Sequence, residues 1–179
     1  MIYFISDTHF NQPEVIEYCK RPFKDVVHMN NELIKNWNSK ITENDNVYIL
    51  GDLMYEKSNG FEANDILKYL FGKKYLIKGN NDKFIDDKMF NKNSFEWIKD
   101  YFVLEYGSKK LILFHYPIFF WEEANRSSIH LYGHLHNTFN EWSAKQSEII
   151  HFGKNAFNVG VDVNNYFPVS IDEILNRIK

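Results

Sequence analysis

Five short apolar segments of this chain run directly into residues of the kinds that bind metal ions. The segments are rich in β-branched and aromatic residues, as buried strands are. They cover residues 2–5, 47–50, 75–77, 111–114 and 129–132. In an open α/β sheet, ligand-binding groups lie in the loops that follow the carboxyl ends of the strands. This pattern favours a fold in which the five loops meet at one sheet edge.

The residues that follow these segments are acids, amides and histidines. In chain order they are Asp7-Thr8-His9, Gly51-Asp52, Gly79-Asn80-Asn81-Asp82, His115 and Gly133-His134-Leu135-His136. Taken singly, most have an ordinary structural explanation, because Gly, Asp and Asn are common in turns and an isolated His is often only a hydrogen-bonding partner. Two alternating histidines at a strand end are more specific. The order and spacing of the whole set favour a metal site over unrelated turns.

The segments between and after these strands indicate an α/β domain. Apolar residues spaced by three or four at 29–37 and 66–70 predict helices, so the first half reads as β-α-β-α-β. Gly107-Ser108-Lys109 between apolar runs predicts a hairpin, and further strands at 149–152 and 157–161 favour antiparallel pairs in the second half. Ser170 and Glu173 have the spacing of a capping box that opens a terminal helix.

Length and composition favour one soluble domain. A chain of 179 residues with 44% hydrophobic residues can bury one substantial core and is small for two. No repeat or Pro/Gly/Ser-rich linker divides it, so we expect a single domain over residues 1–179. The 21 Lys and Arg against 24 Asp and Glu give a net charge of −3, which argues against a long nucleic-acid duplex as partner.

The cysteine count and the short apolar N-terminal run indicate the cellular compartment of the protein. Cys19 is the only cysteine, so no internal disulfide can form and the chain suits a reducing compartment; we expect Cys19 itself to be structural. The apolar N-terminal run ends at Ile5, far short of a membrane span. We therefore expect a cytoplasmic protein without a membrane partner. The sequence leaves its oligomeric state open.

The complete motif series is similar to that of the calcineurin-like metallophosphoesterase superfamily. The series Asp7-x-His9, Gly51-Asp52, Gly79-Asn80-x-Asp82, His115 and Gly133-His134-x-His136 covers about three-quarters of the chain. Arg21-Pro22-Phe23, Asn36-Trp37-Asn38 and Asn158-Val159-Gly160-Val161-Asp162 resemble segments of its small single-domain bacterial and phage members. The resemblance implies an α/β fold: a four-layer α/β/β/α sandwich of two mixed β-sheets flanked by helices.

The resemblance also implies two divalent metal ions. Asp7, His9, Asp52 and His136 would hold one ion, and Asp52, Asn80, His115 and His134 the other, with Asp52 bridging them. Mixed carboxylate, imidazole and amide ligands favour borderline metals over an all-oxygen cage. We expect Mn²⁺, with Fe, Zn and Ni as the alternatives. Arg21 and Arg126, in loops between motifs, are candidates for binding the substrate phosphate, as is Asn81.

The activity implied by the resemblance is hydrolysis of a phosphate ester by a hydroxide that bridges the two ions. Asp52, Asn80 and Asn81 are then the candidate catalytic residues. The expected substrate is a small, nucleotide-like phosphomonoester or phosphodiester. Two alternatives stay open: a binding or scaffold protein that keeps the fold with weak or no turnover, and a nuclease acting on short oligonucleotides.

Asn81 departs from the family pattern. Most of the superfamily has a His there, which is thought to protonate the leaving group, with the next Asp orienting it. Asparagine donates a hydrogen bond but delivers no proton at neutral pH, and a general acid contributes about 10²–10⁴-fold in rate. We expect a slower enzyme, a substrate with a good leaving group, or another proton donor. Asp82 is predicted to cap a short helix, and His28, His130 and His151 are predicted to be structural.

Overall fold

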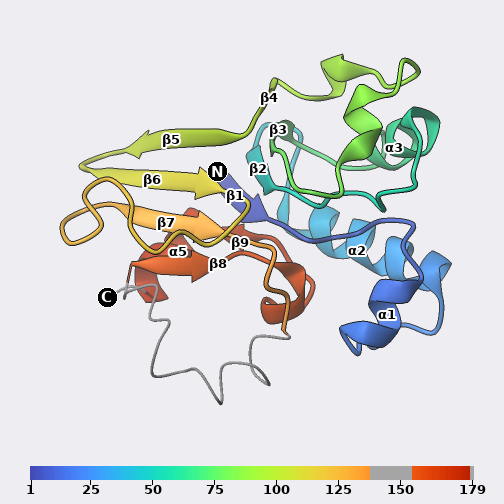
Figure 1. Ribbon diagram of the computed structural model, residues 1–179, viewed down its shortest axis with the longest axis horizontal. Helices are drawn as coiled ribbons and strands as arrows, with labels where there is room; N and C mark the ends of the chain where they lie inside the picture. Colours follow the sequence, from blue (N-terminus) through green and yellow to red (C-terminus); the bar gives the residue numbers. More distant parts are fainter. Residues whose placement is uncertain (138–154, 178–179) are drawn as a thin grey trace.

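The computed structural model describes residues 1–137 and 155–177, which form two mixed β-sheets with flanking helices (Figure 1). The first sheet has the strand order β4-β3-β2-β1-β9. Its strands are β1 (Ile2–Ile5), β2 (Asn46–Leu50), β3 (Lys73–Ile77), β4 (Trp97–Lys99) and β9 (Val169–Ser170). Strands β1 to β4 are parallel, as the β-α-β-α-β reading predicts for the first three, and β9 is antiparallel to β1.

The second sheet has the order β5-β6-β7-β8. Its strands are β5 (Tyr101–Tyr106), β6 (Lys109–Phe114), β7 (Ile129–Tyr132) and β8 (Ala156–Asn158). The predicted hairpin is confirmed: Tyr106 pairs with Lys109 across a turn in which Gly107 has a φ of +59°. The expected antiparallel pairing stops there, because β6, β7 and β8 are parallel. The chain after β6 must therefore return to the opposite sheet edge before β7 begins.

Four α-helices flank the sheets in the described part of the chain: α1 (Glu14–Tyr18), α2 (Val26–Lys40), α3 (Gly60–Leu67) and α5 (Ile171–Arg177). The described residues also form three short 3₁₀ helices, η1 (Lys83–Asp86), η2 (Lys92–Ser94) and η3 (Val161–Val163). The predicted capping box before α5 is confirmed, since Glu173 N–H donates to Ser170 Oγ and Ser170 N–H donates to a Glu173 carboxylate oxygen. Helices α1, α2 and α3 lie on one side of the molecule and the second sheet on the other (Figure 1).

Strand β2 shows how the two cores arise. Successive residues of a strand point to opposite faces, and here both faces are covered. Val47 and Ile49 pack into a core with the apolar faces of α2 and α3. Tyr48 and Leu50 pack into a second core together with residues of β6 and β7. The predicted arrangement of two mixed sheets with flanking helices is confirmed.

Two of the sequence predictions concern residues that the structure does not describe, and two observed strands were not predicted. The strand expected at 149–152 and His151 lie outside the described residues. Strands β4 and β9 were not anticipated, because three and two residues are too short to show a pattern. Among the described helices, none combines the length and the apolar composition needed to cross a bilayer.

Candidate dinuclear metal centre

The five predicted loops meet at one edge, where the carboxyl ends of β1, β2, β3, β6 and β7 converge. Backbone hydrogen bonds fasten the loops to one another: the amide of Asp7 donates to the carbonyl of Gly51 at 3.0 Å, and that of Gly133 to the carbonyl of His115 at 2.9 Å. The amide of His134 donates to both carboxylate oxygens of Asp7, at 3.0 and 2.9 Å. Loops from both sheets are thereby held around a common point.

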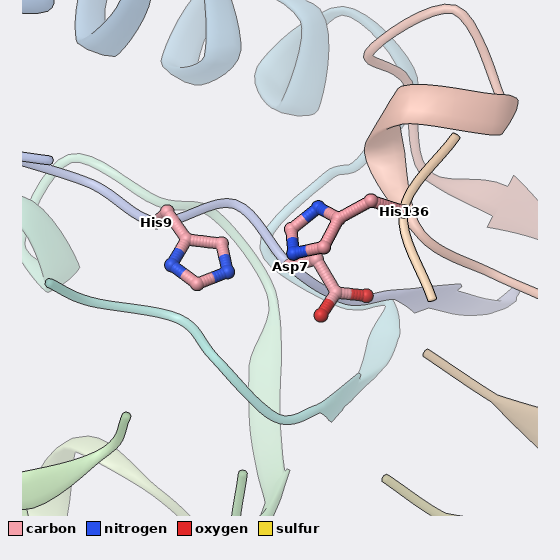
Figure 2. Close-up of side chains that lie close together, drawn as sticks. All are labelled: Asp7, His9 and His136. Carbon is pink, nitrogen blue, oxygen red and sulfur yellow. The ribbon is translucent and has the colours of Figure 1, made fainter. Parts of the chain in front are cut away.

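The acids and histidines on these loops form two groups that could each hold a cation. Asp7, His9 and His136 form one group (Figure 2), and Asp52, His115 and His134 the other; the ligand atoms within each lie no more than 4.8 Å apart. Asp52 joins them, because its Oδ2 is 3.6 Å from Nε2 of both His9 and His115. Asn80 Oδ1 lies 3.1 Å from His115 Nε2. All seven predicted metal ligands are therefore brought together.

In three of the histidines, an acceptor oxygen next to Nδ1 fixes the orientation of the ring. Nδ1 lies 2.7 Å from Gln12 Oε1 in His9, 2.8 Å from the Leu50 carbonyl oxygen in His115, and 2.7 Å from Asp162 Oδ2 in His136. When Nδ1 donates to that acceptor, each ring presents its Nε2 to the site, the arrangement typical of histidine metal ligands.

His9 gives the clearest sign that a cation fits. Its Nε2 is buried and has no hydrogen-bond partner among the described residues. A buried polar atom without a partner costs about 1–3 kcal/mol. A cation between His9 and Asp52 would remove that cost, so the residues present fit a metal ion.

Backbone strain is concentrated at the same residues. Asp7, His9, Asp52, His134 and His136 all have positive φ values, between 48° and 69°. Only a few per cent of non-glycine residues adopt this left-handed conformation, although Asp and His tolerate it better than most. Strain of this kind persists where the surroundings enforce it, and it gathers at functional sites.

Two glycines allow the loops to approach so closely. A Cβ atom on Gly51 would lie 2.4 Å from Nδ1 of His115, and the residue has a φ of +88°. A Cβ on Gly133 would lie 2.2 Å from Ser6 Oγ and 2.5 Å from Asp7 Oδ2. Both positions therefore need glycine, and the signal for them was in the sequence as Gly51-Asp52 and Gly133-His134.

Burial sets the protonation of most of the site. It lowers the pKa of His9 to about 4 and also lowers the pKa of His134, so these rings are neutral, as metal ligands are. Burial likewise raises the pKa of Asp7. His136 differs: burial favours its neutral form, but hydrogen bonds to Asp162 and Cys19 and the charge of Asp7 together raise its pKa to about 10.

Asp162 and Arg21 form a buried ion pair next to His136, and the sequence did not predict this contact. Arg21 Nε donates to Asp162 Oδ1 at 2.8 Å and Nη2 donates to Oδ2 at 2.9 Å. The guanidinium also donates to the carbonyls of Asp7 and Thr8, and neither side chain of the pair is exposed to solvent. The expected role of Arg21 in binding substrate does not fit this burial. Arg21 instead supports Asp162 and the Asp7 loop.

Arg126, the other arginine predicted to bind the substrate phosphate, also lies away from the metal ligands. It is exposed just before β7, and the same loop is tied to the start of β6, because Lys110 forms ion pairs with Glu122 and Glu123 at 2.7 and 3.0 Å. Since β6 and β7 are parallel, this is the edge opposite the metal ligands. This placement does not bring Arg126 to the metal ligands.

The two residues after Asn80 both turn toward Asp52. Asn81 donates from its backbone to Asp52 Oδ1 at 2.8 Å and from its side chain to Oδ2 at 2.7 Å. The Asp82 carboxylate accepts from the backbone N–H groups of Asp52, Leu53 and Gly79 and makes no side-chain capping bond to η1. The capping prediction for Asp82 is therefore wrong. Burial raises its pKa to about 6, with the nearby charge of Asp52 adding to the effect.

The histidines expected to be structural behave so where they are described. His28 lies in the first turn of α2 and is partly exposed, and His130 is buried with Nδ1 near the Ile112 carbonyl and Nε2 accepting from Ile118 N–H. Cys19 is buried at the end of α1, within 4.8 Å of His136 and Asp162. Asp162 is already bound on both oxygens by Arg21, so Cys19 is better explained as packing behind the site.

Comparison with known proteins agrees with this geometry. The family model for calcineurin-like phosphoesterases matches residues 1–164, and the chain belongs to this family of metal-dependent phosphoester hydrolases. It is 38% identical over 179 residues to an uncharacterized protein of Methanocaldococcus jannaschii, covering 99% of this chain and 91% of that protein. It is also similar to the crystal structure of a protein of unknown function from Aquifex aeolicus, with 27% identity, a TM-score of 0.73 and 98% of each chain covered.

Proposed function

We propose that the protein is a dinuclear phosphoesterase that hydrolyses a small phosphate ester, with Mn²⁺ as the expected metal. The observation that carries the proposal is the position of Asp52, whose Oδ2 is equally distant, at 3.6 Å, from the Nε2 atoms of His9 and His115. One carboxylate between two sets of ligands is an arrangement that could serve a pair of cations.

The charge of the proposed site suits a phosphate ester. Two divalent ions would bring four positive charges, and the carboxylates of Asp7 and Asp52 would offset two of them. Divalent ions in such a pair supply Lewis acidity toward phosphoryl oxygens and lower the pKa of water. The chain itself orients two of the ligands, because Gln12 contacts His9 and Asp162 contacts His136.

Asn81 is hydrogen-bonded to the carboxylate that the two groups of ligands share. Its side chain donates to Asp52 Oδ2, the same oxygen that lies between His9 and His115. A carboxamide in this position would lie close to a phosphate ester held at the site. Asn81 can then donate a hydrogen bond to a phosphoryl oxygen, but the proton for the leaving group must come from elsewhere.

The test uses metal-free protein with bis- and mono-p-nitrophenyl phosphate. Adding Mn²⁺ is expected to start turnover and to give about two ions per chain, with Fe, Zn and Ni compared in parallel. Asp52→Asn is expected to abolish turnover and lower the metal stoichiometry, whereas Asp65→Asn on the exposed face of α3 serves as the matched control. Activity that survives chelation or Asp52→Asn would contradict the proposal.

A further inference from the structure

A cavity of about 400 Å³ opens beside the metal ligands and shares only Asn80 with them. It lies where the loop after β3 meets the end of β6, and Asn80 and Asp82 are among its lining residues. Its volume falls in the range of small-molecule sites, about 300–1,000 Å³. A group attached to a phosphate at the metal centre can therefore extend into it.

One wall of the cavity is aromatic and held in place. Tyr116 and Phe114 line it, with ring centroids 5.7 Å apart. The Tyr116 hydroxyl donates to Asn80 Oδ1 at 3.3 Å, and its ring lies against His134 at 4.6 Å. Tyr116 is still 38% exposed. A flat surface fixed next to the reacting centre and open to solvent suits stacking with another ring.

The other charged side chains that line the cavity balance one another. They are Lys78, Lys83, Asp86 and Asp100, and Lys78 Nζ lies 2.6 Å from Asp100 Oδ1. The Asp82 carboxylate is turned away into backbone N–H groups. Two cations against two anions give no net attraction for a second phosphate group. The balance favours an uncharged group with hydrogen-bonding atoms.

We propose that this cavity is the subsite for a nucleoside, so that the substrate is a nucleotide whose base stacks on Tyr116 while its phosphate lies at the metal centre. The proposal rests on the proposed function, and it adds the class of group attached to the phosphate. A base supplies the flat ring, and its edge and the ribose supply the donors and acceptors that Lys83, Asp86 and Asp100 can meet. A sugar carrying a second phosphate is disfavoured by the balanced charge.

The test compares AMP with ribose 5-phosphate, which has a hydroxyl group in place of the base. Phosphate release by the Mn²⁺-loaded enzyme is expected to show a KM about tenfold lower for AMP, the effect of one stacked base. Tyr116→Ala is expected to bring the ratio of the two KM values close to one. Tyr116→Leu, which keeps apolar bulk without a flat ring, is expected to do the same and serves if the alanine variant does not fold.

Tyr106→Ala is the matched control. Tyr106 is 36% exposed, almost as much as Tyr116, but it lies at the hairpin end of β5, away from the cavity. This variant is expected to keep the wild-type ratio. A wild-type ratio near one, or a ratio that survives Tyr116→Leu, would overturn the proposal.

A binding measurement separates failure of the subsite from failure of the proposed function. Adenosine has no phosphate, so its binding by equilibrium dialysis requires no turnover. Saturable binding that is lost in Tyr116→Leu and kept in Tyr106→Ala would support the subsite even if no ester were hydrolysed. An enzyme that hydrolyses p-nitrophenyl esters but binds no adenosine would overturn the subsite alone.

Discussion

Replacing Asp162 by Asn tests whether the buried pair behind His136 prepares that ring for metal. The carboxylate accepts from His136 Nδ1 at 2.7 Å and from Arg21 at 2.8 and 2.9 Å. An amide of the same shape has one acceptor oxygen and no charge, so it cannot accept all three hydrogen bonds or neutralise the guanidinium. Loss of such a partner typically lowers metal affinity about 10–100-fold, which corresponds to about 1.4–2.7 kcal/mol.

The same substitution leaves a buried guanidinium without its counter-ion. Breaking a buried ion pair costs up to about 3–5 kcal/mol in the free energy of unfolding. Metal affinity, from competition with a chelator, and stability, from urea unfolding without metal, must therefore be measured separately. Asp172→Asn, on the exposed first turn of α5, is the control for both.

A double mutant shows whether the effect passes through His136. In a His136→Gln background, Asp162→Asn is expected to cause little further loss of metal affinity, because the ligand that it orients is already gone. Unchanged affinity in the single variant, or an equally large additional loss in the double variant, would refute the positioning role of Asp162.

Three further predictions follow from individual contacts. Asn81→His is expected to keep the metal content and to raise kcat more for alkyl than for p-nitrophenyl esters; equal gains would count against the missing-acid explanation. Gly133→Ala is expected to lose about 1–3 kcal/mol of unfolding free energy and to bind metal more weakly, because its Cβ would meet Ser6 and Asp7; wild-type urea unfolding would disprove this. The N-terminal amine, with help from Thr42, lowers the pKa of Asp45 to about 2, so stability present above pH ~4 should fall as pH drops toward 2; an equally steep fall in Asp45→Asn would contradict it.

The meeting of these side chains at one sheet edge could be predicted because its signal is local, whereas the division of the ligands between two ions came from the family resemblance. Each strand is short and apolar, and each ligand group follows it within a few residues, as Asp7 follows Ile5 and His115 follows Phe114. Parallel strands then place their carboxyl ends together without any long-range information. The cytoplasmic location and the absence of a long duplex partner, both expected from composition, stay predictions.

The remaining contacts depend on tertiary structure that local patterns do not encode. Arg21 and Asp162 are 141 residues apart, and no periodicity connects them, although both lay in segments that resembled the family. Asp82 precedes a short helix, yet three backbone N–H groups outside that helix bind its carboxylate instead. Arg126 lies between two motifs in sequence, but the connection between parallel strands takes it to the far edge.

Anomalous X-ray scattering from crystals grown with Mn²⁺ tests the central claim most directly. The account predicts two peaks per chain on either side of Asp52, one beside Asp7, His9 and His136 and the other beside Asn80, His115 and His134. A single peak, or two peaks that do not share the Asp52 carboxylate, would contradict it.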